Sequence, residues 1–163
     1  MSRYRPNNLL ERELPVAPMP IGTFRNVLEV GNLLYISGQG PLDNNGVLHK
    51  GKVGRDVSTQ IANTHARLVG LNLLAVLKAH LGDLQRVKRI VKLLGFVNAV
   101  DDFEEHPQVI NGCSDLLVEA FGEDGVHARS SIGVASLPNN ITVEVEAIVE
   151  IFPEGQSESH GNG

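Results

Sequence analysis

The hydrophobic and polar positions along this chain follow two periods, and the points where one period replaces the other define the predicted elements. Alternation of apolar and polar residues indicates a strand with one buried face, whereas apolar residues at three- and four-residue steps indicate a helix. In chain order the pattern predicts strands at Val27–Val30 and Leu33–Ser37, a helix at about Asp56–His80, a strand at Arg86–Asn98, a helix at about Glu104–Phe121, and strands at Ser130–Ser136 and Ile141–Ile151.

The order strand-strand-helix-strand-helix-strand-strand predicts an α/β (α+β) domain, a mixed sheet with both helices packed on one face. Residues 26–152 carry these elements and are predicted to form a single domain. Four prolines before residue 25 predict an irregular arm over residues 1–25, with one short helical turn around Leu9–Leu14. Residues 153–163 are rich in Gly, Ser and Glu and predict a flexible tail.

Composition narrows the class of protein. The chain has 163 residues, of which 42% are apolar and 20% charged, as is typical of a soluble globular protein. A net charge of -5 without a dense basic run counts against a nucleic-acid or anionic-membrane surface. The start lacks the apolar segment of a secretory signal, and no apolar run approaches the roughly 20 residues of a membrane span. Cys113 is the single cysteine, so we expect a reducing, cytoplasmic compartment.

The last two strands are joined by a short link, residues 137–140, which predicts a hairpin. In the register that fits the pattern, Val134 faces Val143 and Ile132 faces Val145 on the core side. The other face, which the helices do not cover, then carries a basic group, two carboxylates and small residues. These are Arg129, Ser131 and Gly133 beside Thr142, Glu144 and Glu146.

Such a face suits the binding of a small acidic molecule. A guanidinium matches a carboxylate in two parallel hydrogen bonds, and a nearby carboxylate can orient or deprotonate water. Ser131 and Gly133 are small and would leave room for a ligand. From the residues alone, an ordinary Arg–Glu pair on an exposed strand face, worth a few tenths of a kcal/mol, is the simpler alternative.

Five segments resemble the Rid family, also called YjgF/YER057c/UK114 or endoribonuclease L-PSP. They are Ser37-Gly38-Gln39, Asn111, Ala128-Arg129-Ser130, Val134-Ala135-Ser136-Leu137-Pro138 and Val143-Glu144-Val145-Glu146-Ala147-Ile148. The resemblance runs over about residues 21–151 and implies a chorismate-mutase-like fold. It also implies a homotrimer with three clefts between subunits.

The imine deaminase branch of this family implies the hydrolysis of reactive 2-imino or enamine acids to 2-keto acids and ammonia. By resemblance, Arg129 would grip the substrate carboxylate and Glu144 would place the hydrolytic water. Ser37, Gly38 and Asn111 would line the pocket. No metal or organic cofactor is implied, because an imine is already electrophilic.

Two positions differ from that branch. Ser131 stands in place of its cysteine and Phe24 in place of its tyrosine, and both belong to the expected substrate-binding set. The alternatives are a module that binds or senses a small carboxylate metabolite without turnover, and a ribonuclease, against which the acidic charge counts. The six histidines lack metal-ligand spacing. His127, two residues before Arg129, could reach the mouth of the cleft, but an exposed loop residue is the simpler interpretation. Cys113 is interpreted as a core residue.

Overall fold

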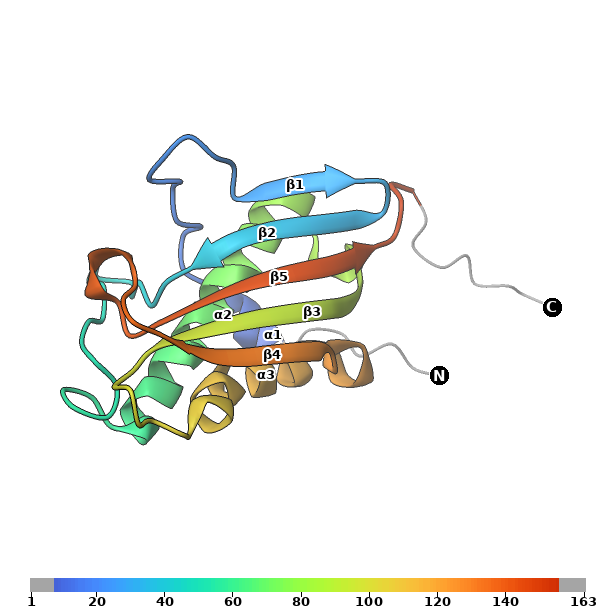
Figure 1. Ribbon diagram of the computed structural model, residues 1–163. Helices are drawn as coiled ribbons and strands as arrows, with labels where there is room; N and C mark the ends of the chain where they lie inside the picture. The colour runs from blue at the N-terminus through green and yellow to red at the C-terminus, as the bar shows by residue number, and fades with distance from the viewer. Residues whose placement is uncertain (1–7, 156–163) are drawn as a thin grey trace.

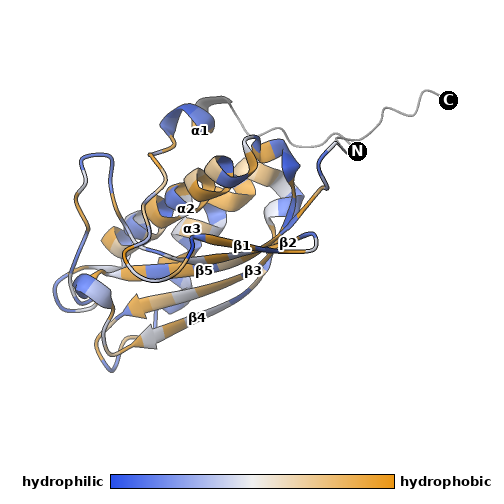
Figure 2. Cartoon of the chain, turned by 90° about the horizontal axis from the view of Figure 1, so that it is seen from above, coloured by the Kyte–Doolittle hydropathy of each residue, from blue (hydrophilic) through white to orange (hydrophobic). Residues whose placement is uncertain are grey.

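The computed structural model describes residues 8–155 (Figure 1). A five-stranded mixed sheet forms one layer, and two long helices cover one of its faces (Figure 2). The sheet order is β1-β2-β5-β3-β4. The elements are α1 (Asn8–Glu13), β1 (Val27–Val30), β2 (Leu33–Gln39), α2 (Thr59–Leu81), η1 (Leu84–Arg86), β3 (Val87–Asn98), α3 (His106–Phe121), η2 (Gly122–Gly125), β4 (Ala128–Val134), η3 (Pro138–Asn140) and β5 (Val143–Ile151).

The predicted fold class and element order are confirmed. The arm before β1 holds the short helix α1, which is tied to α2 by an ion pair of 3.3 Å between Glu11 and Lys78. Leu10 of α1 is buried in the core. The predicted flexible tail lies outside the described residues from position 156 onward. Within residues 8–155, no helix is long and apolar enough to cross a membrane.

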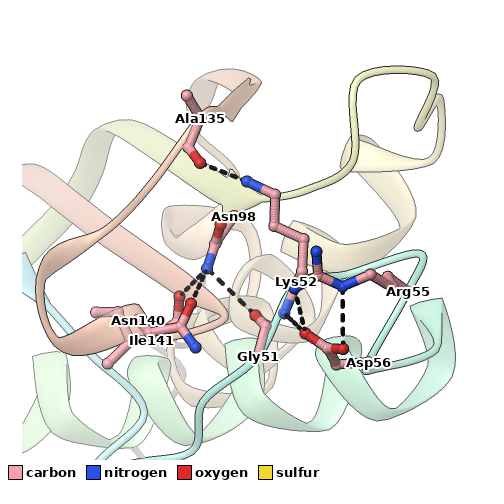
Figure 3. Close-up of polar contacts among 8 residues, drawn as sticks. All are labelled: Gly51, Lys52, Arg55, Asp56, Asn98, Ala135, Asn140 and Ile141. Carbon is pink, nitrogen blue, oxygen red and sulfur yellow. Dashed lines mark hydrogen bonds and ion pairs between the residues drawn. The ribbon is translucent and has the colours of Figure 1, made fainter.

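Local chemistry sets the ends of α2. The Ser58 side chain accepts a backbone N–H of the first turn, and Gly82, with φ of 79°, ends the helix. The helix begins at Thr59 and not at about Asp56, because the Asp56 carboxylate accepts the backbone N–H of Lys52 instead and closes the preceding loop (Figure 3).

Glycines allow α2 and α3 to approach closely. A Cβ placed on Gly112 of α3 would lie 2.0 Å from the backbone oxygen of Asn63 in α2. Cys113 is fully buried beside this contact, as predicted, and burial raises the pKa of its thiol to about 12. The helix pair therefore forms a rigid layer behind the sheet.

The predicted hairpin between the last two strands is wrong. β4 pairs in parallel with β3 at the sheet edge, while β5 lies between β2 and β3. The link between them therefore crosses the end of β3. Asn98, the last residue of β3, holds this link, because its side-chain amide nitrogen reaches the oxygens of Gly51, Asn140 and Ile141 at 3.0–3.3 Å (Figure 3). Asn139 and Asn140 take positive φ values of 56° and 58° to make the turn.

Candidate functional site

Arg129 lies on the edge strand β4 and reaches toward α3. Its Nη1 donates hydrogen bonds to Asn111 Oδ1 at 2.8 Å and to Ser114 Oγ at 3.0 Å. Both hydrogens of Nη1 are therefore in use. Among the described residues, Nε and Nη2 have no partner, so three N–H groups remain for an anion. A carboxylate can pair side-on with that fork.

The structure corrects the predicted face of Arg129. In the parallel pairing Arg129 is in register with Leu93, a fully buried core residue, and so lies on the helix side of the sheet. The space expected beside Gly133 is filled, because a Cβ there would lie 2.5 Å from Nε2 of His106 in α3. Ser131 Oγ is buried on the same side without a hydrogen-bond partner among the described residues.

Glu144 lies on the other side of the sheet, which we call the open face because it is turned away from α2 and α3. It is in register with Phe96. A Cβ on Gly38 would lie 2.8 Å from the Glu144 carboxyl, so the absence of a side chain at Gly38 makes the space that this carboxyl occupies. Thr142 was also expected on the open face, but it is buried and bonded to His65 of α2 at 2.9 Å.

Burial raises the pKa of Glu144 above its ordinary range, and the neighbouring carboxylate of Glu146 raises it further. A half-buried carboxyl of this kind can accept a proton from water and return it within one reaction cycle.

A hollow of about 670 Å³ lies on the open face beside Glu146. Phe24 and Arg25 line it from the arm, and Ser37 lines it from β2. The Ser37 hydroxyl donates to the backbone oxygen of Arg25 at 2.7 Å, which fastens the arm to the strand. The sequence-predicted residues Phe24 and Ser37 therefore share one concave surface.

The predicted site residues form two half-sites in one chain. Arg129 and Asn111 form the first, on the helix side of β4. Glu144 and Gly38 are in contact and form the second, on the open face, near the hollow that Ser37 and Phe24 line. The sheet separates the two half-sites. The prediction that Arg129 and Glu144 of the same chain share a face is therefore wrong.

Sequence reasoning missed the contact between Ser114 and His127. Ser114 Oγ lies 2.9 Å from His127 Nε2, and His127 Nδ1 lies 2.6 Å from the backbone oxygen of Gly125. His127 is half-buried and hydrogen-bonded, so its interpretation as an exposed loop residue is wrong. Two spacings were available as a signal: Ser114 follows Asn111 by three residues of one helix, and His127, just before β4, precedes Arg129 by two residues.

Among residues 8–155, no group of three or more His, Cys, Asp or Glu side chains could hold a metal ion. His160 lies outside the described residues.

Comparison with known proteins identifies relatives over most of the chain. Residues 8–152 match the family described as "YjgF/chorismate mutase-like, putative endoribonuclease". Protein TCP17 of Trypanosoma cruzi is 41% identical over 140 residues, which are 85% of this chain and 88% of that protein. A 2-iminobutanoate/2-iminopropanoate deaminase of Dermatophagoides farinae is 32% identical over 142 residues, covering 84% of this chain and 92% of the relative.

The solved structure of Atu1372 from Agrobacterium tumefaciens, a protein of unknown function, is 46% identical with a TM-score of 0.79. The similarity covers 83% of this chain and 87% of that one. The family expected from the sequence motifs is thus confirmed by sequence and by fold. This chain belongs to the YjgF/chorismate mutase-like family.

Proposed function

We propose that this protein hydrolyses reactive 2-imino or enamine acids to 2-keto acids and ammonia in a cleft between subunits of a homotrimer. The single observation that carries the proposal is the pair of half-sites. Arg129 offers an unpaired guanidinium fork, and Glu144 offers a carboxyl with a raised pKa. Two relatives named 2-iminobutanoate/2-iminopropanoate deaminase support the choice of reaction.

The position of the half-sites supports the proposed assembly. Arg129 and Glu144 lie on opposite sides of one sheet, so a complete site needs the second half-site of another copy. The open face also exposes apolar side chains that a second copy would remove from water, with a gain of roughly 25 cal/mol per Å². On the strands, the most exposed are Leu28, Val30, Tyr35 and Ile132, at 57%, 56%, 44% and 44%.

The proposed chemistry uses one water molecule for each substrate. The substrate carboxylate pairs with Nε and Nη2 of Arg129, which holds the C=N carbon in the cleft. Glu144 takes a proton from water as the water oxygen bonds to the carbon of the N-protonated imine, giving a neutral carbinolamine. The same proton then passes from Glu144 to the nitrogen. As the C–N bond breaks with its electron pair leaving on nitrogen, the carbinolamine hydroxyl gives its proton to the Glu144 carboxylate, and ammonia and the 2-keto acid result.

The direct test measures the loss of 2-iminobutanoate generated in situ by an amino-acid oxidase. We expect Arg129→Ala to lower kcat/KM by about 10- to 100-fold, the value of a charge-assisted hydrogen-bonded contact. Arg67→Ala is the matched control, because Arg67 is an arginine whose partner Glu119 lies on the surface between α2 and α3. Equal rates for wild type and Arg129→Ala, or no rate above the uncatalysed reaction for wild type, would overturn the proposal.

Ser131 favours a second candidate function, the binding of a small carboxylate without turnover. The related deaminases were expected to carry a cysteine here, and the Ser131 hydroxyl is buried with no partner among the described residues. A thermal-shift titration with 2-oxobutanoate, followed by recovery of the ligand, separates the two functions. Stabilisation by a keto acid in a protein that leaves imines unchanged supports binding alone.

A further inference from the structure

A directed chain of hydrogen bonds ends on the Arg129 guanidinium. The Gly125 carbonyl can only accept, so Nδ1 of His127 carries the hydrogen between them. In the neutral imidazole Nε2 is then an acceptor and receives the hydroxyl hydrogen of Ser114. The Ser114 oxygen is left to accept the N–H of Arg129. Neutral His127 thus fixes the direction of every bond in the chain.

The Gly125 end of this chain of hydrogen bonds is closely packed. A Cβ on Gly125 would lie 2.2 Å from the backbone oxygen of Leu117, so η2 is packed directly against α3. The carbonyl that holds His127 and the helix that carries Ser114 therefore belong to one packed unit. Asn111, on the same helix, supplies the second acceptor for Nη1. The guanidinium is held through Nη1 from two points of α3, and Nε and Nη2 keep no partner among the described residues.

We propose that Ser114 and His127 are positioning residues for Arg129, and that the neutral form of His127 holds the guanidinium ready for a carboxylate. The inference rests on the proposed function only in taking Arg129 as the carboxylate-binding group. It adds that the affinity of Arg129 for a carboxylate depends on pH through the protonation of His127.

The surroundings keep His127 neutral near pH 7. Burial lowers the pKa of His127, the hydrogen bond to Gly125 raises it, and the positive charge of Arg129 on β4 lowers it. From α3 the imidazole meets the uncharged Ser114 hydroxyl. Within the described residues, the exposed acids of η2, Glu123 and Asp124, make no hydrogen bond to it.

Protonation of His127 would reverse the hydrogen bond between its Nε2 and the Ser114 hydroxyl. Nε2 would then donate to Ser114, and the Ser114 hydroxyl hydrogen would lose its acceptor. The serine oxygen has a lone pair for each donor, but two positive charges would then repel each other across one oxygen. Nη1 of Arg129 would lose its place, and carboxylate affinity would fall as the pH drops through the pKa of His127. A purely electrostatic role predicts the opposite sign, because an added positive charge strengthens the binding of an anion. The direction of the pH dependence therefore separates the two roles.

The binding experiment uses the full-length oligomer and 2-oxobutanoate as the probe, titrated calorimetrically between pH 5 and 8. We expect the wild-type affinity to fall at the acidic end. His127→Gln keeps an acceptor for Ser114 but does not titrate, so it should bind like wild type at pH 7.5 and lack the acidic fall. Ser114→Ala should bind about tenfold more weakly at pH 7.5. His80→Gln is the control, because His80 pairs with Glu29 of β1 and should leave the profile unchanged.

A second measurement needs no ligand. In the ¹⁵N NMR spectrum, the Arg129 side-chain signals should shift with the protonation of His127 in wild type and not in Ser114→Ala. Three results would each overturn the inference. The first is a wild-type affinity that stays constant or rises toward low pH, and the second is a loss of affinity at acidic pH that persists in His127→Gln. The third is that the Arg129 signals do not shift when His127 is protonated. If the probe does not bind, the NMR coupling alone decides it. If the coupling and the binding profile appear but no imine is hydrolysed, the deaminase proposal fails and the positioning role stands.

Discussion

Because Gly38 has no side chain, it leaves room for the carboxyl group of Glu144. Alanine at this position would place a carbon 2.8 Å from Cδ and Oε2 of Glu144 and push the carboxylate out of place. We expect Gly38→Ala to lower kcat/KM for imine hydrolysis by about tenfold or more, since displacements of about 1 Å can cost 100-fold. The free energy of unfolding should change little, because the displaced side chain can turn toward solvent. Steady-state assays and thermal unfolding of the same preparation measure both effects.

Gly31→Ala is the matched control for Gly38→Ala. Gly31 lies in the β1–β2 turn with φ of 59° and no atom within 4 Å of an added Cβ. Its replacement should cost about 1–2 kcal/mol of stability through left-handed backbone strain and leave catalysis intact. Full activity in Gly38→Ala would mean that the observed place of the Glu144 carboxyl is not the working one.

The raised pKa of Glu144 predicts a pH dependence with a definite sign. A general base works in its ionised form, so kcat/KM should rise with pH through a midpoint above the ordinary range of a glutamate. Glu146→Gln removes the repelling neighbour and should move this midpoint to lower pH. Glu150→Gln, farther along the same strand face and paired with Lys88, should not move it. If the midpoint stays fixed in Glu146→Gln, the rise of kcat/KM with pH belongs to a group other than Glu144.

The raised pKa of Glu144 also makes the stability of the folded protein depend on pH. Because the folded-state pKa of Glu144 is raised, its contribution to stability is present at low pH and is lost as the pH rises through the raised value. At neutral pH the folded protein therefore holds a carboxylate that burial disfavours. We expect Glu144→Gln to melt at a slightly higher temperature than wild type at pH 7 while losing activity, as measured by calorimetry and the imine assay.

At the level of elements, the contact between α2 and α3 has no room for a methyl group. Alanine in a helix usually gains about 1 kcal/mol over glycine. Gly112→Ala should instead destabilise the protein by about 3 kcal/mol, because its Cβ would lie 2.0 Å from a backbone oxygen that cannot turn aside. Urea unfolding measures the difference. Asp115→Ala, an exposed position of the same helix, is the control and should not destabilise it.

The C-terminal ends of α2 and α3 were predictable because the glycines that follow them, Gly82 and Gly122, act locally. The bounds of β4 were not, since it runs over Ala128–Val134 and not over Ser130–Ser136. The partner of β4 was not predictable either. Alternation shows which residues of a strand share a face, but it does not show which neighbour they pair with or which face is covered. In β4 the usual rule is reversed: Ile132 is 44% exposed on the open face, while Arg129 lies on the helix side. A register that buried Ile132 was self-consistent and wrong.

The candidate site was predictable only in part for the same reason. Motifs identified Arg129, Asn111 and Glu144 as residues, but the two half-sites became separate only when β5 was placed between β2 and β3. Ser114 and His127 come together because β4 lies at the sheet edge beside α3. The spacings link Ser114 to Asn111 and His127 to Arg129, but they do not show that α3 and β4 lie side by side, because that contact depends on the topology of the sheet.

At the scale of the whole molecule, the proposed homotrimer would account for both the reversed polarity of β4 and the exposed apolar side chains of the open face. Ile132 and the exposed side chains of Leu28 and Tyr35 point to the same side of the sheet, which another copy would cover in the proposed homotrimer. Each cleft would then take its Arg129 from one chain and its Glu144 from the next. Exchange of chains between two inactive variants can test that division.

Arg129→Ala and Glu144→Gln should each keep at most about a tenth of the wild-type kcat/KM alone. They should complement each other when unfolded together and refolded as a 1:1 mixture. In a closed ring with heterologous contacts, a cleft is intact only when a chain that keeps Arg129 precedes a chain that keeps Glu144, which random assembly gives in about a quarter of clefts. The mixture should therefore recover about a quarter of the wild-type rate per cleft. The double variant mixed with either single variant is the control and should recover nothing. If the 1:1 mixture stays inactive while it assembles like wild type, both residues must act within one chain, and the sheet that separates them rules out a shared substrate.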